Sequence, residues 1–228
     1  ITRFSLGMPE DILLPIANLN KELIRAMQAL PGNGTRYDET QGNMRLRKSI
    51  ARFTYSWKGN LTEDDIVISN FNNPLGSCMP DEHKRVVVDM LAGYDIPLIE
   101  DDLYGDLFFG NSRPKPCKAF DKKGLVLWCG AVSKTLAPGY RVGWIAPGKF
   151  KHAIIRQKNI HLISTPALNQ EAVANFMEND RYENHLRKLR QELYANSIHF
   201  AHSIMDYFPE NTKIVTPQGG FMLWVELD

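Results

Sequence analysis

The sequence predicts an α/β fold with a mostly parallel sheet, flanking helices and a smaller α+β domain. Short apolar runs bounded by glycine or proline, such as residues 66–68 and 124–129, have the length and composition of buried strands. Amphipathic stretches with helical spacing of their apolar residues alternate with these runs. The run that begins at Ile96 ends in three carboxylates, and ligands collect at the carboxyl ends of parallel strands.

The remaining elements follow in chain order from periodicity and from turn residues. A helix at 15–30 stops at the Pro-Gly-Asn-Gly sequence of residues 31–34, and proline in the first turn opens a helix at 80–91. Further helices are predicted at residues 44–57, 152–162, 166–177 and 182–208, and further strands at 142–145 and 222–225. On the last helix, the charged side chains of His185, Arg187, Lys188 and Arg190 are expected to form a solvated face.

Composition excludes several classes of function. A net charge of +1 gives no indication of a basic surface that would bind nucleic acid or an anionic membrane. No apolar run is long enough to cross a bilayer, and the six histidines lack the spacing of metal ligands. The three cysteines are odd in number and unpatterned, which predicts a reducing, cytoplasmic location.

The run at residues 130–144, GAVSKTLAPGYRVGW, carries the chemistry. Ser133 and Lys134 lie in a turn, because Pro138-Gly139 prevents a helix from continuing through it. A lysine on a tight turn between two apolar strands is partly desolvated, which lowers its pKa and frees the amine for carbonyl chemistry. Arg141 adds a cation suited to phosphate. The alternative is a surface loop whose lysine and arginine face water.

This run resembles the cofactor-lysine segment of the class I/II aminotransferases, which are fold-type I enzymes dependent on pyridoxal 5'-phosphate. The resemblance implies that Lys134 holds the cofactor as a Schiff base and that Ser133 and Arg141 hold its phosphate. Ala131 departs from the family, which has serine or threonine there. One phosphate hydroxyl is therefore missing, which weakens cofactor binding without abolishing it.

Motifs earlier in the chain resemble the same family. Residues 4–9 resemble its Gly-x-Pro entry motif, which implies that the backbone of Gly7 approaches the substrate carboxylate. Tyr37, followed by Gly42 and Leu46-Arg47, resembles the tyrosine that reaches the phosphate of a partner subunit's cofactor, which implies a homodimer. The alternative for Tyr37 is an aromatic side chain that packs a loop against the core.

Two further motifs imply contacts with the cofactor ring. Asn73, in an Asn-Pro-Leu-Gly loop, would bond the 3-oxygen and help to place the substrate carboxylate. Asp101 would pair with the ring nitrogen, and Tyr104 would bond the 3-oxygen. Asp102 points to the opposite strand face, so we expect its replacement by alanine to be mild. The alternative for the Asn-Pro-Leu-Gly loop is an ordinary turn, and the acidic cluster taken alone is more typical of a solvated strand end.

The resemblance also implies a division into domains. We expect an N-terminal arm at residues 1–15, a cofactor-binding large domain at 16–163 and a small domain at 164–228 that continues beyond the printed sequence. In the family a phosphate-cradling helix and further strands follow the strand that matches residues 66–68. Here the Asn-Pro-x-Gly loop follows directly. Since parallel neighbours need a long crossover, we expect the full protein to contain several dozen more residues between Ile68 and Ser69.

Two functions are consistent with this pattern. The first is transfer of an amino group between an amino acid and a 2-oxo acid, with Lys134 moving the proton. The second follows from residues 70–76 and 185–190, which resemble MocR-type regulators of the GntR family. Such regulators join a winged-helix DNA-binding domain to an aminotransferase-like domain that senses pyridoxal phosphate or an amino acid. DNA would be bound only through a domain that precedes Ile1.

Overall fold

The computed structural model describes residues 11–30, 41–53, 67–69, 78–162, 164–178, 181–215 and 217–227. Its helices are α1 (Ile16–Ala29), α2 (Met44–Phe53), α3 (Asp81–Gly93), α4 (Lys151–His161), α5 (Ala167–Met177) and α6 (Arg181–Tyr207). Its strands are β1 (Val67–Ser69), β2 (Leu98–Asp101), β3 (Val126–Ala131), β4 (Gly143–Ala146), β5 (Lys213–Val215) and β6 (Trp224–Glu226). Each of these elements lies where the sequence predicts one, except β5, which the sequence does not predict.

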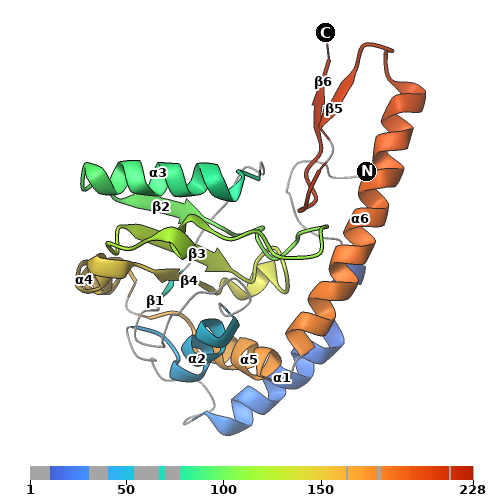
Figure 1. The fold of residues 1–228 in the computed structure, drawn as a ribbon. Helices are drawn as coiled ribbons and strands as arrows, with labels where there is room; N and C mark the ends of the chain where they lie inside the picture. The colour runs from blue at the N-terminus through green and yellow to red at the C-terminus, as the bar shows by residue number, and fades with distance from the viewer. Residues whose placement is uncertain are drawn as a thin grey trace.

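Four strands form the main sheet in the order β1-β4-β3-β2, and β5 and β6 form a separate hairpin (Figure 1). The α/β class is confirmed, but the described sheet is mixed rather than mostly parallel. Only β2 and β3 are parallel, whereas β4 is antiparallel to both β3 and β1. The physical reason is the short connection at residues 132–142, which can reverse the chain but is too short for a crossover to a parallel neighbour.

The chain reaches β2 from β1 by a long crossover. Residues 70–97 connect the two strands and contain α3. This connection is long enough for parallel strands, so strand geometry does not itself require extra residues. In the printed chain Ile68 and Ser69 both belong to β1 and pair with β4. The existence of further residues in the full protein at this point stays a prediction.

The two faces of the sheet bury different sets of side chains. Trp128 and Trp144 lie in the main core with residues of α1, α2, α5 and α6. Leu127, Cys129 and Ile145 face the other way and pack against α4. Neighbouring positions alternate because successive strand residues point to opposite faces. Figure 1 shows α1, α2 and α5 together below the sheet, and α3 above it.

Helix α6 belongs to this core only along its first half. Tyr182, Leu186, Leu189 and Leu193 are buried at helical spacing, whereas the later residues of α6 are mostly exposed. The second half leads away from the sheet to the β5–β6 hairpin (Figure 1). Helix α5 is also part of the main core, with Val173 and Ala174 fully buried. We therefore propose a domain boundary within α6, in place of the expected boundary at residue 163.

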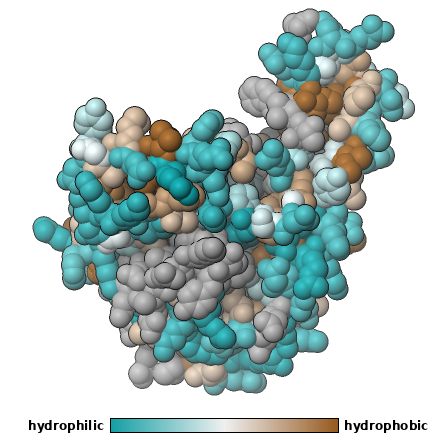
Figure 2. All heavy atoms as spheres, in the orientation of Figure 1, coloured by the Kyte–Doolittle hydropathy of each residue, from teal (hydrophilic) through white to brown (hydrophobic). Residues whose placement is uncertain are grey.

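Apolar side chains are exposed in two regions of the described surface. Val86, Tyr94 and Ile99 are exposed on or beside α3 and β2, and Ile99 is 73% exposed. The second region surrounds the end of α6 and the hairpin and includes Tyr207 and Leu227. Figure 2 shows hydrophobic atoms in both regions. Strand β2 pairs with β3 along one edge, and no described strand pairs with its other edge.

Candidate functional site

The predicted site residues of the described part lie at one end of the β2–β3 pair. Asp101 is the last residue of β2 and lies opposite Cys129 in the parallel register. Both strands therefore end at the same edge of the sheet, where β2 continues to Tyr104 and β3 continues to Lys134. The amine of Lys134 lies over the ring of Tyr104, with 5.8 Å between Nζ and the ring centroid.

A compact turn holds Lys134 between β3 and β4. The Val132 carbonyl accepts backbone hydrogen bonds from Leu136 and Ala137 at 2.8 and 3.0 Å, and the Val132 N–H donates to Val142 at 3.2 Å. Arg141 closes the turn in the left-handed backbone region, with φ of 54°. Residues other than glycine rarely adopt this conformation, and where they do the strain is often tied to function.

The charged groups around the lysine adjust one another's protonation. Burial, followed by the positive charge of Arg141, lowers the pKa of Lys134 below its usual range, while the Asp101 carboxylate acts in the opposite direction. Partial desolvation beside the lysine turn also raises the pKa of Asp101, whose side chain stays largely exposed, and that of Tyr104. The outcome is a lysine with more neutral amine at a given pH than an exposed lysine, next to a carboxylate and a phenol.

Asp102 has a different environment from its neighbour Asp101. Its Oδ2 accepts hydrogen bonds from the Arg113 guanidinium at 2.6 Å and from the Trp128 indole at 2.7 Å. Arg113 is buried and also pairs with Asp106 at 2.6 Å. Gly105 packs so closely on this group that a Cβ there would lie 2.3 Å from Asp102 Oδ1. Asp102 is therefore a partner of a buried arginine, so Asp102→Ala should cost stability, whereas its mild effect on the chemistry stays a prediction.

Helix α6 reaches the lysine turn, which the sequence did not lead us to expect. His185 was predicted on a solvated face, but its Nε2 lies 2.6 Å from the Thr135 carbonyl oxygen. Arg190 is also part-buried, donating to the Asp106 carbonyl and lying 4.4 Å from the Phe108 ring centroid. The sequence did contain a signal, since Tyr182 and His185 share the spacing of the apolar stripe at Leu186.

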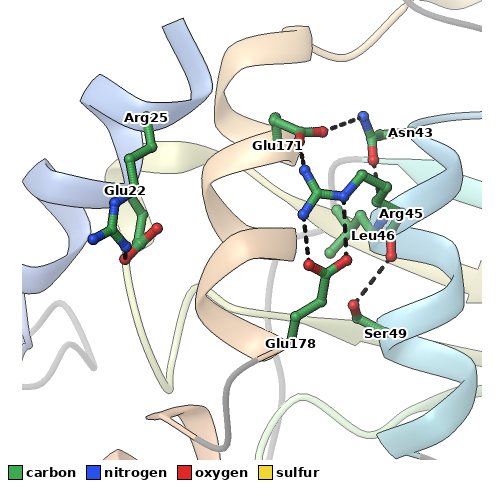
Figure 3. Close-up of polar contacts among 8 residues, drawn as sticks. All are labelled: Glu22, Arg25, Asn43, Arg45, Leu46, Ser49, Glu171 and Glu178. Atoms are coloured by element: carbon green, nitrogen blue, oxygen red, sulfur yellow. Dashed lines mark hydrogen bonds and ion pairs between the residues drawn. The ribbon is translucent and has the colours of Figure 1, made fainter. Parts of the chain in front are cut away.

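Three predicted site residues lie outside the described part of the chain, namely Gly7, Tyr37 and Asn73. The chain that follows the Tyr37 segment is held firmly. Asn43 caps α2 by accepting from the Leu46 N–H at 3.0 Å, and its backbone N–H donates to Gln170 at 2.8 Å. The Asn43 amide also donates to Glu171 at 2.9 Å (Figure 3).

Ion pairs strengthen the same contact between α2 and α5. Arg45 bridges Glu171 and Glu178, two carboxylates of the α5 segment (Figure 3). Glu171 is buried, so its charge is offset by the guanidinium and by the Asn43 amide. On α1, the buried Glu22 pairs in the same way with Arg25 and with Arg181 of α6.

Two surface hollows in the described residues lie away from the lysine. One, of about 490 Å³, is lined by the end of α6 and the hairpin, including Tyr207 and Leu227. The other, of about 360 Å³, lies between Phe108–Asn111 and α6. Lys134 lines neither, so the candidate site is defined by converging side chains. Among the described residues no cluster of histidine, cysteine, aspartate or glutamate could hold a metal ion.

Other features bear on the setting of the chain. None of the described helices combines the length and hydropathy that crossing a membrane requires. Cys78, Cys117 and Cys129 are all free, and Cys129 is buried. Burial raises the pKa of the Cys129 thiol to about 12, so this thiol is unreactive near neutral pH.

Comparisons with known proteins agree with this geometry. Residues 56–228 match the family described as aminotransferase class I and II. The chain is 36% identical over 203 residues to the uncharacterized HTH-type transcriptional regulator YjiR of Escherichia coli (strain K12), covering 89% of this chain and 43% of that protein. It is 29% identical over 162 residues to aromatic-amino-acid aminotransferase 1 of Thermococcus litoralis, covering 70% and 39%.

The fold resembles solved aminotransferases. The kynurenine aminotransferase of Pyrococcus horikoshii, whose crystal structure contains PMP, superposes with a TM-score of 0.87 at 19% identity, covering 97% of this chain and 74% of that one. The alpha-aminoadipate aminotransferase LysN of Thermus thermophilus gives a TM-score of 0.84 at 17% identity, covering 98% and 76%. The chain spans less than half the length of the curated relatives it matches, including YjiR.

Proposed function

Because the chain belongs to the aminotransferase class I and II family, we propose that it forms the core of a domain that binds pyridoxal 5'-phosphate and transfers an amino group between an amino acid and a 2-oxo acid. The observation that carries the proposal is the approach of Lys134 to Tyr104 and Asp101 at one end of β2 and β3. The activity of the whole protein is part of the proposal, since relatives such as YjiR are longer.

The donor set fits the cofactor. A neutral lysine amine can condense with an aldehyde, and a lowered pKa provides more of it. Arg141 and Ser133 offer a guanidinium and a hydroxyl for phosphate, and Asp101 offers a carboxylate for a ring nitrogen. When bound, pyridoxal phosphate supplies the electron sink for the substrate's α-carbon. Ala131 contributes no hydroxyl, so we expect phosphate binding to rely on the other groups.

Each described residue then has a physical task. Lys134 accepts and returns a proton at Nζ, for which its lowered pKa is suited. The ring of Phe221 packs edge-on against Tyr104 at 5.3 Å between centroids, which places Tyr104 so that its hydroxyl would donate a hydrogen bond to the cofactor's 3-oxygen. The Asp101 carboxylate would pair with the ring nitrogen and keep it protonated. Gly7, Tyr37 and Asn73 remain proposed contacts to the substrate carboxylate, a partner subunit's phosphate and the 3-oxygen.

Covalent trapping tests the role of the lysine. Full-length protein incubated with pyridoxal phosphate should show a visible absorption band, and borohydride should fix the cofactor on Lys134, as mapped by mass spectrometry. A Lys134→Ala protein that keeps a reducible cofactor at this site would overturn the assignment. Lys123, which is exposed and bonds the Ala92 carbonyl, provides a matched control for non-specific labelling.

A second function is favoured by the names of several relatives. YjiR, YdcR and YisV are each called an HTH-type transcriptional regulator, and this chain spans 43%, 34% and 33% of their lengths. Under this alternative the same site senses pyridoxal phosphate or an amino acid, and DNA is bound through another domain. Assaying the full-length protein for amino-group transfer and for cofactor-dependent DNA binding separates the two functions.

The proposed homodimer is tested by subunit mixing. If Tyr37 reaches a partner's phosphate, a mixed dimer of Tyr37→Ala and Lys134→Ala subunits has one site with both native residues. Mixing the two inactive proteins should therefore restore part of the activity. Continued inactivity of mixtures shown to exchange subunits would mean that both residues serve the same subunit.

A cytoplasmic location also stays a proposal, which fractionation of the source cells would test.

A further inference from the structure

Two side chains of α6 hold the chain directly after Lys134. The Thr135 hydroxyl lies 2.8 Å from the Tyr182 hydroxyl, and His185 Nε2 lies 2.6 Å from the Thr135 carbonyl oxygen. A carbonyl oxygen only accepts hydrogen bonds, so Nε2 must carry a proton and donate. Thr135, the residue that follows Lys134, is thus bonded to α6 through both its side chain and its carbonyl.

Both contacts lie in a well-packed environment. Thr135 has no exposed surface, and Tyr182 is 2% exposed. The His185 ring packs edge-on against Phe176, with 6.3 Å between centroids. Burial lowers the pKa of His185 and raises that of Tyr182, so both side chains are neutral near pH 7. Neutral donors can restrain the turn without adding charge beside the lysine amine.

We propose that Tyr182 and His185 are positioning residues for Lys134, which they fix by clamping the Thr135 peptide to α6. The clamp keeps the amine over the Tyr104 ring and within electrostatic reach of Asp101 and Arg141. This proposal rests on the proposed function only because it takes Lys134 to be the reacting group. Because α6 continues to the hairpin, the clamp also ties the lysine to the helix that leaves the main core (Figure 1).

A purely structural role and a positioning role predict different effects of substitutions at Tyr182 and His185. Phenylalanine fills the volume of Tyr182 and leucine approximates that of His185, so packing alone would be largely kept. Positioning depends on the two polar contacts. His185→Gln retains an N–H donor and should rescue what His185→Leu loses. Leu189 lies on the same buried face, 2% exposed, and its replacement by alanine destabilises the helix without removing a contact to Thr135.

The test is the titration of Lys134 by competitive labelling. Full-length protein without added cofactor is acylated with acetic anhydride across a pH range, and mass spectrometry gives the midpoint for each lysine. In the native protein the Lys134 midpoint should lie below the ordinary lysine value of about 10.4. In Tyr182→Phe and His185→Leu it should move upward, toward the ordinary lysine value of about 10.4, as the amine loses its partly buried position.

The controls decide between the two roles. We expect native midpoints in His185→Gln and in Leu189→Ala, although the latter unfolds at a lower temperature. Unchanged midpoints in Tyr182→Phe and His185→Leu would overturn the proposal, as would an equal shift in Leu189→Ala. The labelling needs no cofactor, so it can succeed or fail independently of borohydride trapping on Lys134, which tests the proposed function.

Discussion

At the scale of single residues, Asp101 and Asp102 are neighbours with opposite environments. Asp101 is exposed at the end of β2, whereas Asp102 binds Arg113 and Trp128. Arg113 keeps a second carboxylate, Asp106, so replacing Asp102 removes hydrogen bonds from Arg113 and Trp128 worth about 1.5–3 kcal/mol without leaving the guanidinium unpaired. An exposed carboxylate contributes little to stability, less than about 1 kcal/mol.

We therefore predict a crossed result for the two alanine substitutions. Asp102→Ala should lower the free energy of unfolding by about 1.5–3 kcal/mol, and Asp101→Ala should change it by less than about 1 kcal/mol. Amino-group transfer should instead be lost in Asp101→Ala even where the protein is fully folded. Urea denaturation and activity assays measure the two effects. Similar losses of stability in both variants would contradict the described environments.

The same residues show what a sequence can reveal about a site. Lys134, Asp101 and Tyr104 could be singled out because each lies in a short local motif at the end of a predicted strand. The described structure brings the three residues together at one end of β2 and β3. The contacts of Thr135 could not be predicted, since Tyr182 and His185 lie 47 and 50 residues away in sequence. Such pairs depend on how α6 packs.

At the scale of elements, one aspartate fixes the start of β3. Asp121 accepts hydrogen bonds from the Leu125 and Val126 N–H groups at 3.0 and 2.9 Å, and from Lys118 Nζ at 3.0 Å. Burial acts to raise the pKa of Asp121, but the Val126 N–H and the Lys118 ammonium outweigh it, so the pKa is lowered. The ionised carboxylate therefore stabilises the turn that leads into β3.

We predict that Asp121→Ala lowers the free energy of unfolding by about 3 kcal/mol at pH 7. The folded-state pKa lies below the unfolded value of about 3.9, so this contribution is complete above that value and is lost as the pH falls through the folded-state pKa. The variant should accordingly lose less stability than the native protein between pH 5 and pH 3, as measured by thermal melts. Parallel acid profiles would contradict this role.

The elements themselves were largely predictable because their signals are local. Helix α1 follows from periodicity and from the Pro-Gly sequence after it, and β3 from an uninterrupted apolar run. Strand β5 (Lys213–Val215) was not predicted because three residues are too few to show a strand pattern. Its identity as a strand depends on pairing with β6, which lies further along the chain. The antiparallel direction of β4 was also not predicted, because a sequence pattern indicates that a strand exists but not its direction relative to the neighbouring strand.

At the scale of the whole molecule, the first half of α6 and all of α5 join the sheet in one core. Residues 164–193 therefore support the lysine turn in addition to leading toward the hairpin. A division at residue 163 seemed natural in the sequence because a new helix starts there. The burial of Phe176, Tyr182 and Leu186, which have almost no exposed surface, favours the proposed boundary within α6.

The outer edge of β2 has a practical consequence for work with this 228-residue chain in isolation. No strand of the described residues pairs with this edge, so its backbone N–H and C=O groups, beside an exposed Ile99, form a template on which a second copy can add a strand. We predict concentration-dependent self-association of the isolated chain in light scattering, and a shift toward monomer in Ile99→Lys, with Val86→Lys on α3 as the control. If both variants associate as strongly as the parent chain, edge pairing is not the cause. If edge pairing is the cause, the Ile99→Lys substitution can be used to keep the isolated chain in solution.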